Sequence, residues 1–595
     1  MPEGTATSFA PTLETGSRVA VVGGGPAGSL FSYFLLTMAE RVGIELRVDV
    51  YEPRDFTRPG AAGCNMCGGV VSESMVQLLS AEGIKLPPTV VQRGIESYVL
   101  HMDVGTVRIE TPRNEKRIAA VHRGGGPVGI TGRRWDSFDA HLLDLAGARG
   151  ANVVRERIEG VERRNGLVRV RTKGGSESDY NLFVGAVGIN SPLLKTFERS
   201  GSGYKPPRSA RTYICEFYLG QGSVQAYLGN SMHVFLLSLP RLEFAAIIPK
   251  GDYVTVCLLG HEIDKGLVDA FLASPEVKRC FPPDWTVPET YCRCSPGINV
   301  LGAQQPFADG MVFIGDSGVN RLYKDGIGGA YRTAKAAAKT AIFHGISAND
   351  FRRHYDPVCR ALAQDNAIGR VVFMVTRLIR NARVARRGVL RMTLKEQQGK
   401  IARRRMSGVL WDTFTGSSSY REVFLRTLHP LFIGRLAYET LSDLLQFNLR
   451  LWTKEDKVAL GGLGKIYRAG EVIVRQGDVG DCMYVIQSGK VEVVMEKDGK
   501  EIRLAELGEG DFFGEMALFE KDVRSATVRP LGEVRALTVD RKMFVRKIHD
   551  DPSLAFMVMQ RMSRRLRELN AEIARLSAEK TAPPERLPPL QDEAP

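Results

Sequence analysis

Cysteine is scarce in this chain and follows no repeating pattern. There are nine cysteines in 595 residues, an odd number, which argues against a secreted protein held together by disulfides. Apolar runs of about 18 or more residues are missing. The first residues, MPEGTATSFAPTLETG, lack both the basic and the apolar region of a secretory signal. We therefore expect a cytoplasmic protein.

Patterns of metal ligands are also missing. The nine histidines form no cluster with carboxylates, and Cys292-x-Cys294 lacks the second ligand pair that a zinc site needs. We therefore expect no metal site and interpret each histidine as structural.

Positive charge is plentiful but unevenly spread. The formal net charge is +14, and residues 351–410 hold fifteen Lys and Arg against three acidic residues, a net +12. This segment includes the stretch VVFMVTRLIRNARVARRGVL, which suits an anionic phospholipid surface better than nucleic acid. Two interpretations stay open: a peripheral position at the inner face of the membrane, or a solvated basic surface that covers the main domain.

Changes of pattern divide the chain into five parts. The two ends are loose tails, the second of them rich in proline. Between the tails, alternating strands and helices give way to a basic helical segment and then to short strands separated by glycines. We expect a tail at 1–16, a main domain at 17–341, a helical segment at 342–450, a β-barrel domain with a C-terminal helix at 451–580 and a tail at 581–595.

The motif Gly23-x-Gly25-x-x-Gly28 lies between a buried-strand pattern, RVAVVG, and an apolar helix that extends to about Arg41. The first glycine permits a tight turn, the second lets the backbone approach a pyrophosphate, and the third lets the helix pack on the strand. A second strand, LRVDVYE, ends at Glu52, where a carboxylate can accept from a ribose hydroxyl. The pattern predicts a βαβ unit that binds a dinucleotide.

A second glycine-rich turn lies in MVFIGDSGVNRLYKDGIGGA, where a strand ends at Gly315-Asp316 and an alanine-rich helix follows. The stretch resembles the flavin-side motif of the FAD oxidoreductases that include aromatic hydroxylases and geranylgeranyl reductases. The resemblance implies FAD as the cofactor, with Asp316 near its ribityl and pyrophosphate oxygens. It also implies that Gly326 and Ile327 face the flavin ring.

Within this superfamily the chain resembles the geranylgeranyl reductases most. Their glycine-rich stretch with a cysteine before paired glycines is similar to GCNMCGGVV, which implies that Cys67 lies near the flavin and makes it the candidate catalytic residue. Their substrate strand is similar to FAAIIPK, which begins at Phe244, but Ala246 and Ile248 replace the family's Trp and Phe. An apolar or lipid-like substrate is consistent with these replacements.

Two arginines depart from the family pattern. The resemblance implies a cofactor contact for Arg134, in GRRWDSFDAHLL, although it lies one residue further from the Phe-Asp helix start than in the family. Arg321 stands near the place of a family proline. The resemblance covers residues 18–341 and implies an α/β, Rossmann-like FAD-binding domain with an inserted β-sheet substrate domain.

The type of reaction stays open between two classes. Aromatic hydroxylases keep a Gly-Ala-Asp-Gly motif that serves FAD and NADPH, and this chain has Val187 in place of the aspartate. The Trp-x-Trp-x-Ile-Pro signature of flavin-dependent halogenases is missing. We favour a reductase or dehydrogenase over a monooxygenase, with NAD(P)H as a candidate electron donor. Two interpretations stay open for Cys64 and Cys67. They are either a redox pair or part of a packed turn in which Cys64 is incidental.

The stretch FGEMALFEKDVRSATV, residues 513–528, combines a glycine-acid helix start with an arginine nine residues after the glutamate. Helix N–H groups and one guanidinium can bind a single phosphate. The stretch resembles the phosphate-binding cassette of cyclic nucleotide-binding domains, as in catabolite activator protein and the regulatory subunits of protein kinase A. The resemblance implies that Arg524 binds the cyclic phosphate, Glu515 accepts from the ribose 2′-OH and Gly514 permits close backbone approach. Ser525 leaves cAMP and cGMP open, and we favour cAMP.

Apolar residues after this domain recur as in a coiled coil, at Met562, Leu566, Leu569, Ile573 and Leu576. They predict either a homodimer or a helix that packs on its own domain. Only 19 residues follow Leu576, too few for a helix-turn-helix, so we expect no DNA binding. Together the motifs predict an FAD-dependent oxidoreductase regulated by a cyclic nucleotide; the alternative is a non-catalytic flavin and cyclic-nucleotide sensor or scaffold.

Overall fold

The protein is described from a computed structural model, in which the chain divides into two compact units. One unit contains Met1–Gln77 and Lys85–Ile466, and the other contains Leu78–Ile84 and Tyr467–Pro595. The structure describes residues 11–111, 115–128, 135–399, 404–445, 463–497, 500–516, 523–541, 544–545, and short stretches within 559–574.

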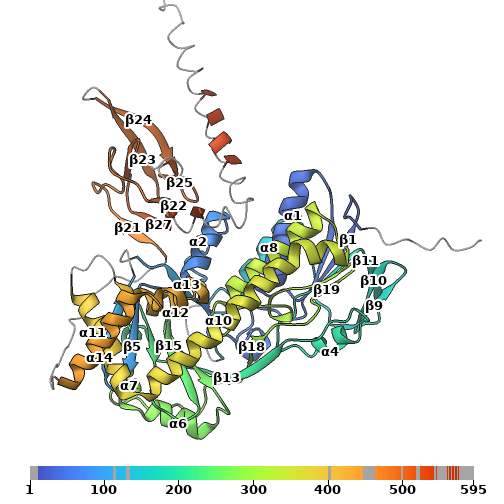
Figure 1. Cartoon of the computed structure of the whole chain (residues 1–595). Helices are drawn as coiled ribbons and strands as arrows, with labels where there is room; N and C mark the ends of the chain where they lie inside the picture. The colour runs from blue at the N-terminus through green and yellow to red at the C-terminus, as the bar shows by residue number, and fades with distance from the viewer. Residues whose placement is uncertain are drawn as a thin grey trace, which may run out of the picture. The chain divides into compact units, whose positions relative to one another are not determined.

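A sheet in the order β19-β20-β12-β1-β2-β8 forms one half of the first unit (Figure 1). All its strands are parallel except β19. Their bounds are Phe307–Ala308, Met311–Phe313, Leu182–Gly185, Arg18–Val22, Arg47–Tyr51 and Asn152–Val154, in that order. Residues 19–22 are buried, as expected for a parallel strand covered on both faces. The predicted βαβ unit is confirmed as β1, helix α1 (Pro26–Val42) and β2.

Helices cover one face of this sheet, and a small antiparallel sheet covers the other. Helices α1 and α8 (Gly326–Phe343) pack together, and α1 also packs on α3 (Phe138–Ala148). An antiparallel sheet of β9 (Ile158–Arg164), β10 (Leu167–Thr172) and β11 (Glu177–Tyr180) shares a core with β1, β12 and β20.

A larger sheet in the order β17-β13-β16-β15-β14-β5-β6 forms the other half. Neighbouring strands are antiparallel except β14 and β5, and β18 also pairs with β13. The bounds are Cys292–Cys294, Arg208–Tyr218, Tyr253–Gly260, Leu242–Lys250, Ser231–Phe235, Ser97–Met102 and Gly105–Glu110, and Gly297–Leu301 for β18. A small sheet contains β3 (Val70–Val71), β7 (Ile118–Val121) and β4 (Val91–Ile95), and helix α2 spans Glu73–Ala81.

The larger sheet is buried on both faces. One core includes Tyr98, Leu100 and Val234, together with Trp411 from helix α12 (Arg405–Thr415). The opposite core includes Phe235 and is covered by α5 (Gln221–Tyr227), α6 (Lys265–Ala273) and α7 (Pro275–Lys278). Side chains alternate between the faces along each strand, so neighbouring residues enter different cores.

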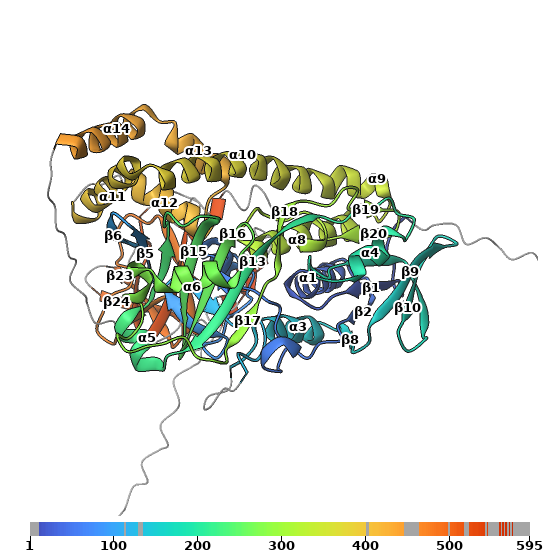
Figure 2. The same cartoon turned by 90° about the horizontal axis from the view of Figure 1, so that it is seen from below.

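The predicted helical segment is a row of helices along one side of the first unit, which Figure 2 shows most clearly. Helix α10 packs on α8, and α11 packs on β6. The elements are α9 (Ala348–Asp350), a π-helix (Phe351–Tyr355), α10 (Asp356–Asn381), α11 (Arg383–Gln398), α12, α13 (Tyr420–Thr427) and α14 (Pro430–Leu445). Among the described helices, none is long and apolar enough to cross a membrane.

The second unit is built from two antiparallel sheets. Their orders are β21-β27-β22-β25 and β24-β23-β26, and side chains from both enter one core. The bounds are Lys465–Tyr467, Val534–Asp540, Cys482–Ser488 and Phe512–Phe513, then Lys500–Leu507, Val491–Lys497 and Thr527–Pro530. The expected glycine turns have positive φ, at Gly470, Gly477, Gly489, Gly510 and Gly514. In place of the predicted barrel, the described residues form two sheets that share one core.

Candidate functional site

The first glycine motif forms the turn between β1 and α1. Gly23 has φ +109, and a side chain there would meet the Ala186 carbonyl at 2.5 Å. A side chain at Gly28 would collide with the Gly23 carbonyl oxygen. Gly25 precedes α1 and provides no side-chain cap, so the first N–H groups of the helix stay available to an anion.

Glu52 is buried at the end of β2, beside this turn. One carboxylate oxygen accepts from the Gly24 N–H at 2.9 Å and the other from the Arg54 N–H at 3.0 Å. Burial raises the pKa of Glu52 from its usual range, and these two bonds oppose the rise. Each oxygen keeps a lone pair that can accept from a hydroxyl of a ligand.

The second glycine turn connects β20 to α8. Gly315 has φ +59, and Asp316 accepts from the Asn320 side chain at 2.6 Å. Burial raises the pKa of Asp316. Helix α8 begins at Gly326 after Asp325, which has φ +58 and whose side chain accepts no capping hydrogen bond from the helix.

These two turns line one cavity of about 350 Å³ in the first unit. The predicted residues that border it are Gly23, Gly25, Glu52, Cys67, Phe244, Ala246, Ile248, Asp316, Gly326 and Ile327. Gly28 and Gly315 support the turns from behind, because the space beside each is filled by other atoms. The two glycine turns, almost 300 residues apart in the sequence, therefore border the same cavity.

Two polar side chains at the cavity were missed by the sequence motifs. Arg123 and Asn65 both line it, and both hydrogen-bond Asp139 in the first turn of α3. Arg134, the predicted arginine, lies outside the described residues. The Asp139 carboxylate belongs to the Phe-Asp helix start, which was the signal available in the sequence; its partner Arg123 comes from a loop that no motif marks.

The thiols near the cavity are unpaired. Cys64 and Cys67 are both free, and only Cys67 borders the cavity. Burial raises the pKa of Cys64, which keeps it protonated and a weak nucleophile. These observations favour a packed turn over a redox pair. Cys257, on β16, is a further thiol at the cavity wall that the sequence analysis did not single out.

Lys324 borders the cavity and lies against two aromatic rings. Its Nζ lies 4.7 Å from the ring centre of Phe244 and 4.8 Å from that of Phe414. Burial and, secondarily, the neighbouring Arg321 lower its pKa to about 7. A lysine with this pKa can exist as ammonium or as amine near neutral pH, so it can hold or release a proton.

Arg321 connects the start of α8 to the helical segment. Its guanidinium donates to the carbonyls of Gly416 and Ser418 and pairs with Asp325 at 3.4 Å. Asp325 in turn accepts from the Ser72 hydroxyl at 2.7 Å. Arg321 is thus a buried structural link.

The predicted phosphate cassette is described in part. Arg524 is 7% exposed and donates to the carbonyls of Gly514 at 2.9 Å and Cys482 at 2.8 Å. A guanidinium has five donors, so these bonds do not exhaust it. Glu515 is also buried, and the Ser525 hydroxyl is exposed with Met516 at 3.8 Å. The helix predicted after Met516 lies outside the described residues.

The predicted coiled-coil seam is described only at its start. Met562 and Leu566 are helical. Met562 packs against the core that contains Met483 and Phe544, while Leu566 is 59% exposed. Leu569, Ile573 and Leu576 lie outside the described residues.

Comparison with known proteins found similar structures and similar sequences. A solved structure of a flavoprotein/dehydrogenase from Cytophaga hutchinsonii is similar with a TM-score of 0.49 and 13% identity, over 72% of this chain and 99% of that one. A cAMP-dependent protein kinase regulatory subunit from Schizosaccharomyces pombe is 42% identical over 81 residues, 14% of this chain and 19% of the relative.

A CRP-like cAMP-activated global transcriptional regulator from Mycobacterium tuberculosis is 34% identical over 108 residues, 18% of this chain and 48% of the relative. The chain thus spans less than half of either relative. Residues 465–551 match the cyclic nucleotide-binding domain family. The C-terminal part of this chain therefore contains a cyclic nucleotide-binding domain.

Proposed function

We propose that the chain is an FAD-dependent oxidoreductase whose activity or location is set by a cyclic nucleotide. The observation that carries the proposal is the shared cavity, where both glycine turns, Glu52 and Asp316 border the same volume as the apolar strand β15. Such a constellation combines a nucleotide cradle with room for an apolar substrate. A flavin bound there would supply the hydride or electron transfer.

The residues present fit FAD. The uncapped start of α1 suits the pyrophosphate, and the free lone pairs of Glu52 suit a ribose hydroxyl. Asp316 faces the same cavity as the start of α8, whose first N–H groups can stabilise negative charge on a bound ring. Arg123, held by Asp139, adds a fixed cation beside Gly25.

A reductase or dehydrogenase is favoured over a monooxygenase. Val187 borders the cavity at the position where hydroxylases keep an aspartate, so the wall is apolar there. Ala246 and Ile248 are likewise apolar and buried. We propose an apolar or lipid-like substrate, with Lys324 as the group that holds a proton or an anionic substrate group, and NAD(P)H as a candidate donor.

The cyclic nucleotide is proposed to be cAMP, because both relatives described above are named for cAMP. Arg524 is proposed to bind its phosphate and Glu515 its ribose. The buried guanidinium is already fixed by two carbonyls, so little side-chain freedom is lost on binding.

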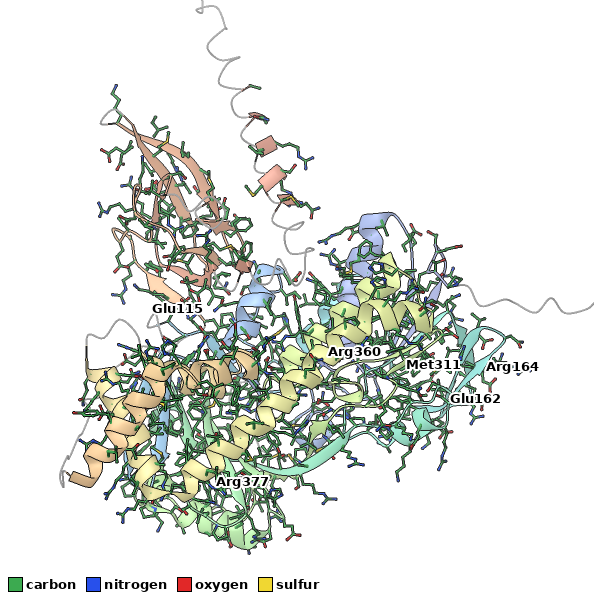
Figure 3. The ribbon with its side chains drawn as sticks, viewed as in Figure 1. Glu115, Glu162, Arg164, Met311, Arg360 and Arg377 are labelled. Carbon is green, nitrogen blue, oxygen red and sulfur yellow. The ribbon has the colours of Figure 1, made fainter. Side chains whose placement is uncertain are left out.

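A peripheral membrane position is proposed from helix α10. It exposes Val371, Met374, Val375 and Leu378 near Arg377, which Figure 3 shows on the same helix as Arg360. Apolar side chains bordered by arginines suit an anionic lipid surface. Binding to anionic vesicles should weaken with salt, and unchanged binding in high salt contradicts the electrostatic part of this proposal.

The deciding experiment is the absorption spectrum of the purified full chain, before and after NADPH, with and without cAMP. We expect a bound flavin that an electron donor bleaches, at a rate or extent that cAMP changes. A colourless protein that takes up no added FAD contradicts the enzyme. A flavoprotein that binds both ligands but turns over no donor supports the sensor instead.

A further inference from the structure

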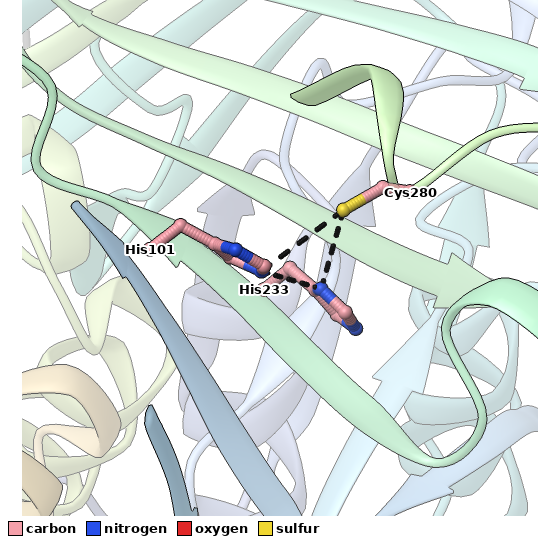
Figure 4. A group of neighbouring side chains, drawn as sticks. All are labelled: His101, His233 and Cys280. Atoms are coloured by element: carbon pink, nitrogen blue, oxygen red, sulfur yellow. Dashed lines mark hydrogen bonds between the residues drawn. The ribbon is translucent and has the colours of Figure 1, made fainter. Parts of the chain in front are cut away.

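Two histidines and a cysteine meet inside the larger sheet of the first unit, far from one another in the sequence. His101 is on β5, His233 is on the neighbouring strand β14, and Cys280 follows α7 (Figure 4). His101 Nε2 lies 2.8 Å from His233 Nδ1, and Cys280 Sγ lies 3.3 Å from His233 Nδ1 and 4.0 Å from His101 Nε2. All three are at least nine-tenths buried. Each therefore turns one potential ligand atom toward a common point.

The outer nitrogens of both rings have partners of their own. His101 Nδ1 lies 3.2 Å from the Thr106 hydroxyl, and His233 Nε2 lies 3.4 Å from the Leu228 carbonyl. A histidine that binds a metal through one nitrogen commonly donates from the other to such an acceptor, which fixes the tautomer and the ring. Both rings can therefore present a lone pair to the common point.

The spacing is close to that of a zinc site. Bonds of about 2.0–2.1 Å to nitrogen and about 2.3 Å to sulfur place neighbouring tetrahedral ligand atoms roughly 3–4 Å apart. The three observed separations, 2.8, 3.3 and 4.0 Å, lie around this range and need only small side-chain adjustments. Two imidazoles and a thiolate are ligands that Zn²⁺ accepts, with a water in the fourth position.

We propose that His101, His233 and Cys280 bind a zinc ion. On binding, the Cys280 thiol loses its proton to solvent and the sulfur forms the bond to the metal. Burial raises the pKa of the Cys280 thiol, and the nearby Arg279 opposes only part of that rise. The site is separate from the cofactor cavity: Met232 and Val234 line the cavity, whereas His233 between them turns to the opposite face of the sheet.

The ion would cross-link the segment that contains α6 and α7 to strands β5 and β14. Cys280 and Phe281 belong to the same core as Phe271 of α6, and His101 stacks on Phe235 at 4.6 Å. A metal bridge between this segment and two strands would therefore stabilise the wall behind the cavity without taking part in its chemistry. The proposal is independent of the flavin and of the cyclic nucleotide.

The test uses the full chain, purified, equilibrated with Zn²⁺ and dialysed against a weak chelator. We expect one zinc per chain by elemental analysis, and affinity lowered by more than about tenfold in Cys280→Ser and His233→Gln. Two controls should keep the metal: Cys215→Ser, a buried cysteine of the same core, and Cys292→Ser, in the half-buried Cys-x-Cys strand that is the obvious competing site.

Co²⁺ provides a second measurement that does not depend on variants that fold. Loading the unaltered chain with Co²⁺ should give a thiolate-to-cobalt charge-transfer band, which Cys292→Ser retains. No retained zinc together with no such band overturns the proposal and leaves a His–His hydrogen bond beside a protonated thiol. Equal loss of metal from Cys280→Ser and Cys292→Ser would also overturn it.

Discussion

The proposed cofactor cavity and the proposed phosphate cassette are built in opposite ways. The cavity joins residues from position 23 to position 415, across two sheets and a helical segment. The cassette groups that the structure describes fall within residues 514–525, and Arg524 reaches back to Gly514 across ten positions. A candidate phosphate site can therefore be proposed from a short segment of sequence, whereas a cavity depends on the whole fold around it. Each of the following changes tests one side of this comparison.

The largest effect is expected for Gly28→Val. A side chain there collides with the Gly23 carbonyl, so the turn and the start of α1 must move. FAD binding, measured from the flavin absorbance after gel filtration with excess FAD, should be lost. Cyclic-nucleotide affinity should be unchanged, because the second unit has its own core.

A matched control for this change is Gly147→Ala in α3, where an added side chain meets nothing within 4 Å. It should bind FAD normally. Normal FAD binding by Gly28→Val would show that the first turn is not the nucleotide cradle.

The second-largest effect is expected for Arg524→Ala, on cAMP affinity. Charge-assisted bonds contribute about 1.5–3 kcal/mol each, so loss of the guanidinium should lower cAMP affinity by roughly tenfold or more in titration calorimetry. Arg529→Ala, in the same unit but paired with Glu492 and Glu501 on the sheet surface, is the control. Unchanged affinity in a folded Arg524→Ala chain would remove the phosphate assignment.

Glu52→Gln should have a smaller effect on FAD. The amide oxygen can keep one of the two backbone bonds and still accept from a ribose hydroxyl, but the charge that strengthens this bond is lost. A charged bond contributes about 1.5–3 kcal/mol and a neutral one about 0.5–1.5 kcal/mol, so we expect a loss of about 1 kcal/mol. We expect weaker FAD binding with the fold retained, as measured by flavin titration and circular dichroism. Equal affinities for the variant and the unaltered chain would place the ribose elsewhere.

The smallest effect concerns Lys324 and pH. With a pKa of about 7, its amine becomes reactive well below the pH at which an ordinary lysine does. Competitive acetylation followed by peptide mass spectrometry should show its labelling rising around pH 7, with the exposed Lys278 as internal standard. Labelling of both lysines in parallel across the pH range would contradict a depressed pKa.

The depressed pKa of Lys324 also makes the stability of the folded state depend on pH. The unfolded chain binds the Lys324 proton up to about pH 10, whereas the folded chain releases it near pH 7. Between these values the unfolded state holds more protons, so this group makes the folded state more stable as the pH rises. Lys324→Met should flatten that part of the pH profile of thermal unfolding.

The sequence motifs located the turns well because each motif is local. Gly23, Gly315 and Gly514 all have the positive φ that a tight turn requires, and this requirement is visible in the residue type itself. The strand and helix on either side of Gly23 follow from apolar runs of the right period. These features need no knowledge of distant contacts.

The motifs could not predict which residues from distant parts of the chain contact the site residues. Arg123 meets Asp139 through a loop, and Phe414 reaches the cavity from a helical segment whose basic charge suggested only a surface. His101 and His233 are 132 positions apart and meet only because β5 and β14 are paired in parallel. Sequence spacing contains no information on such pairings, so the histidines appeared isolated.

Arg321 links the cavity wall to residues far along the chain. Its guanidinium pairs with Asp325, the residue before α8, and donates to the Gly416 carbonyl, which lies 95 positions after Arg321, between α12 and α13. Any ligand that prefers this arrangement at Gly326 must by thermodynamic linkage make the opening of residues 416–418 less favourable, and hydrogen exchange there would report on occupancy of the cavity. Conversely, shortening the chain after α10 would disturb the proposed flavin side of the cavity while leaving both glycine turns intact in sequence.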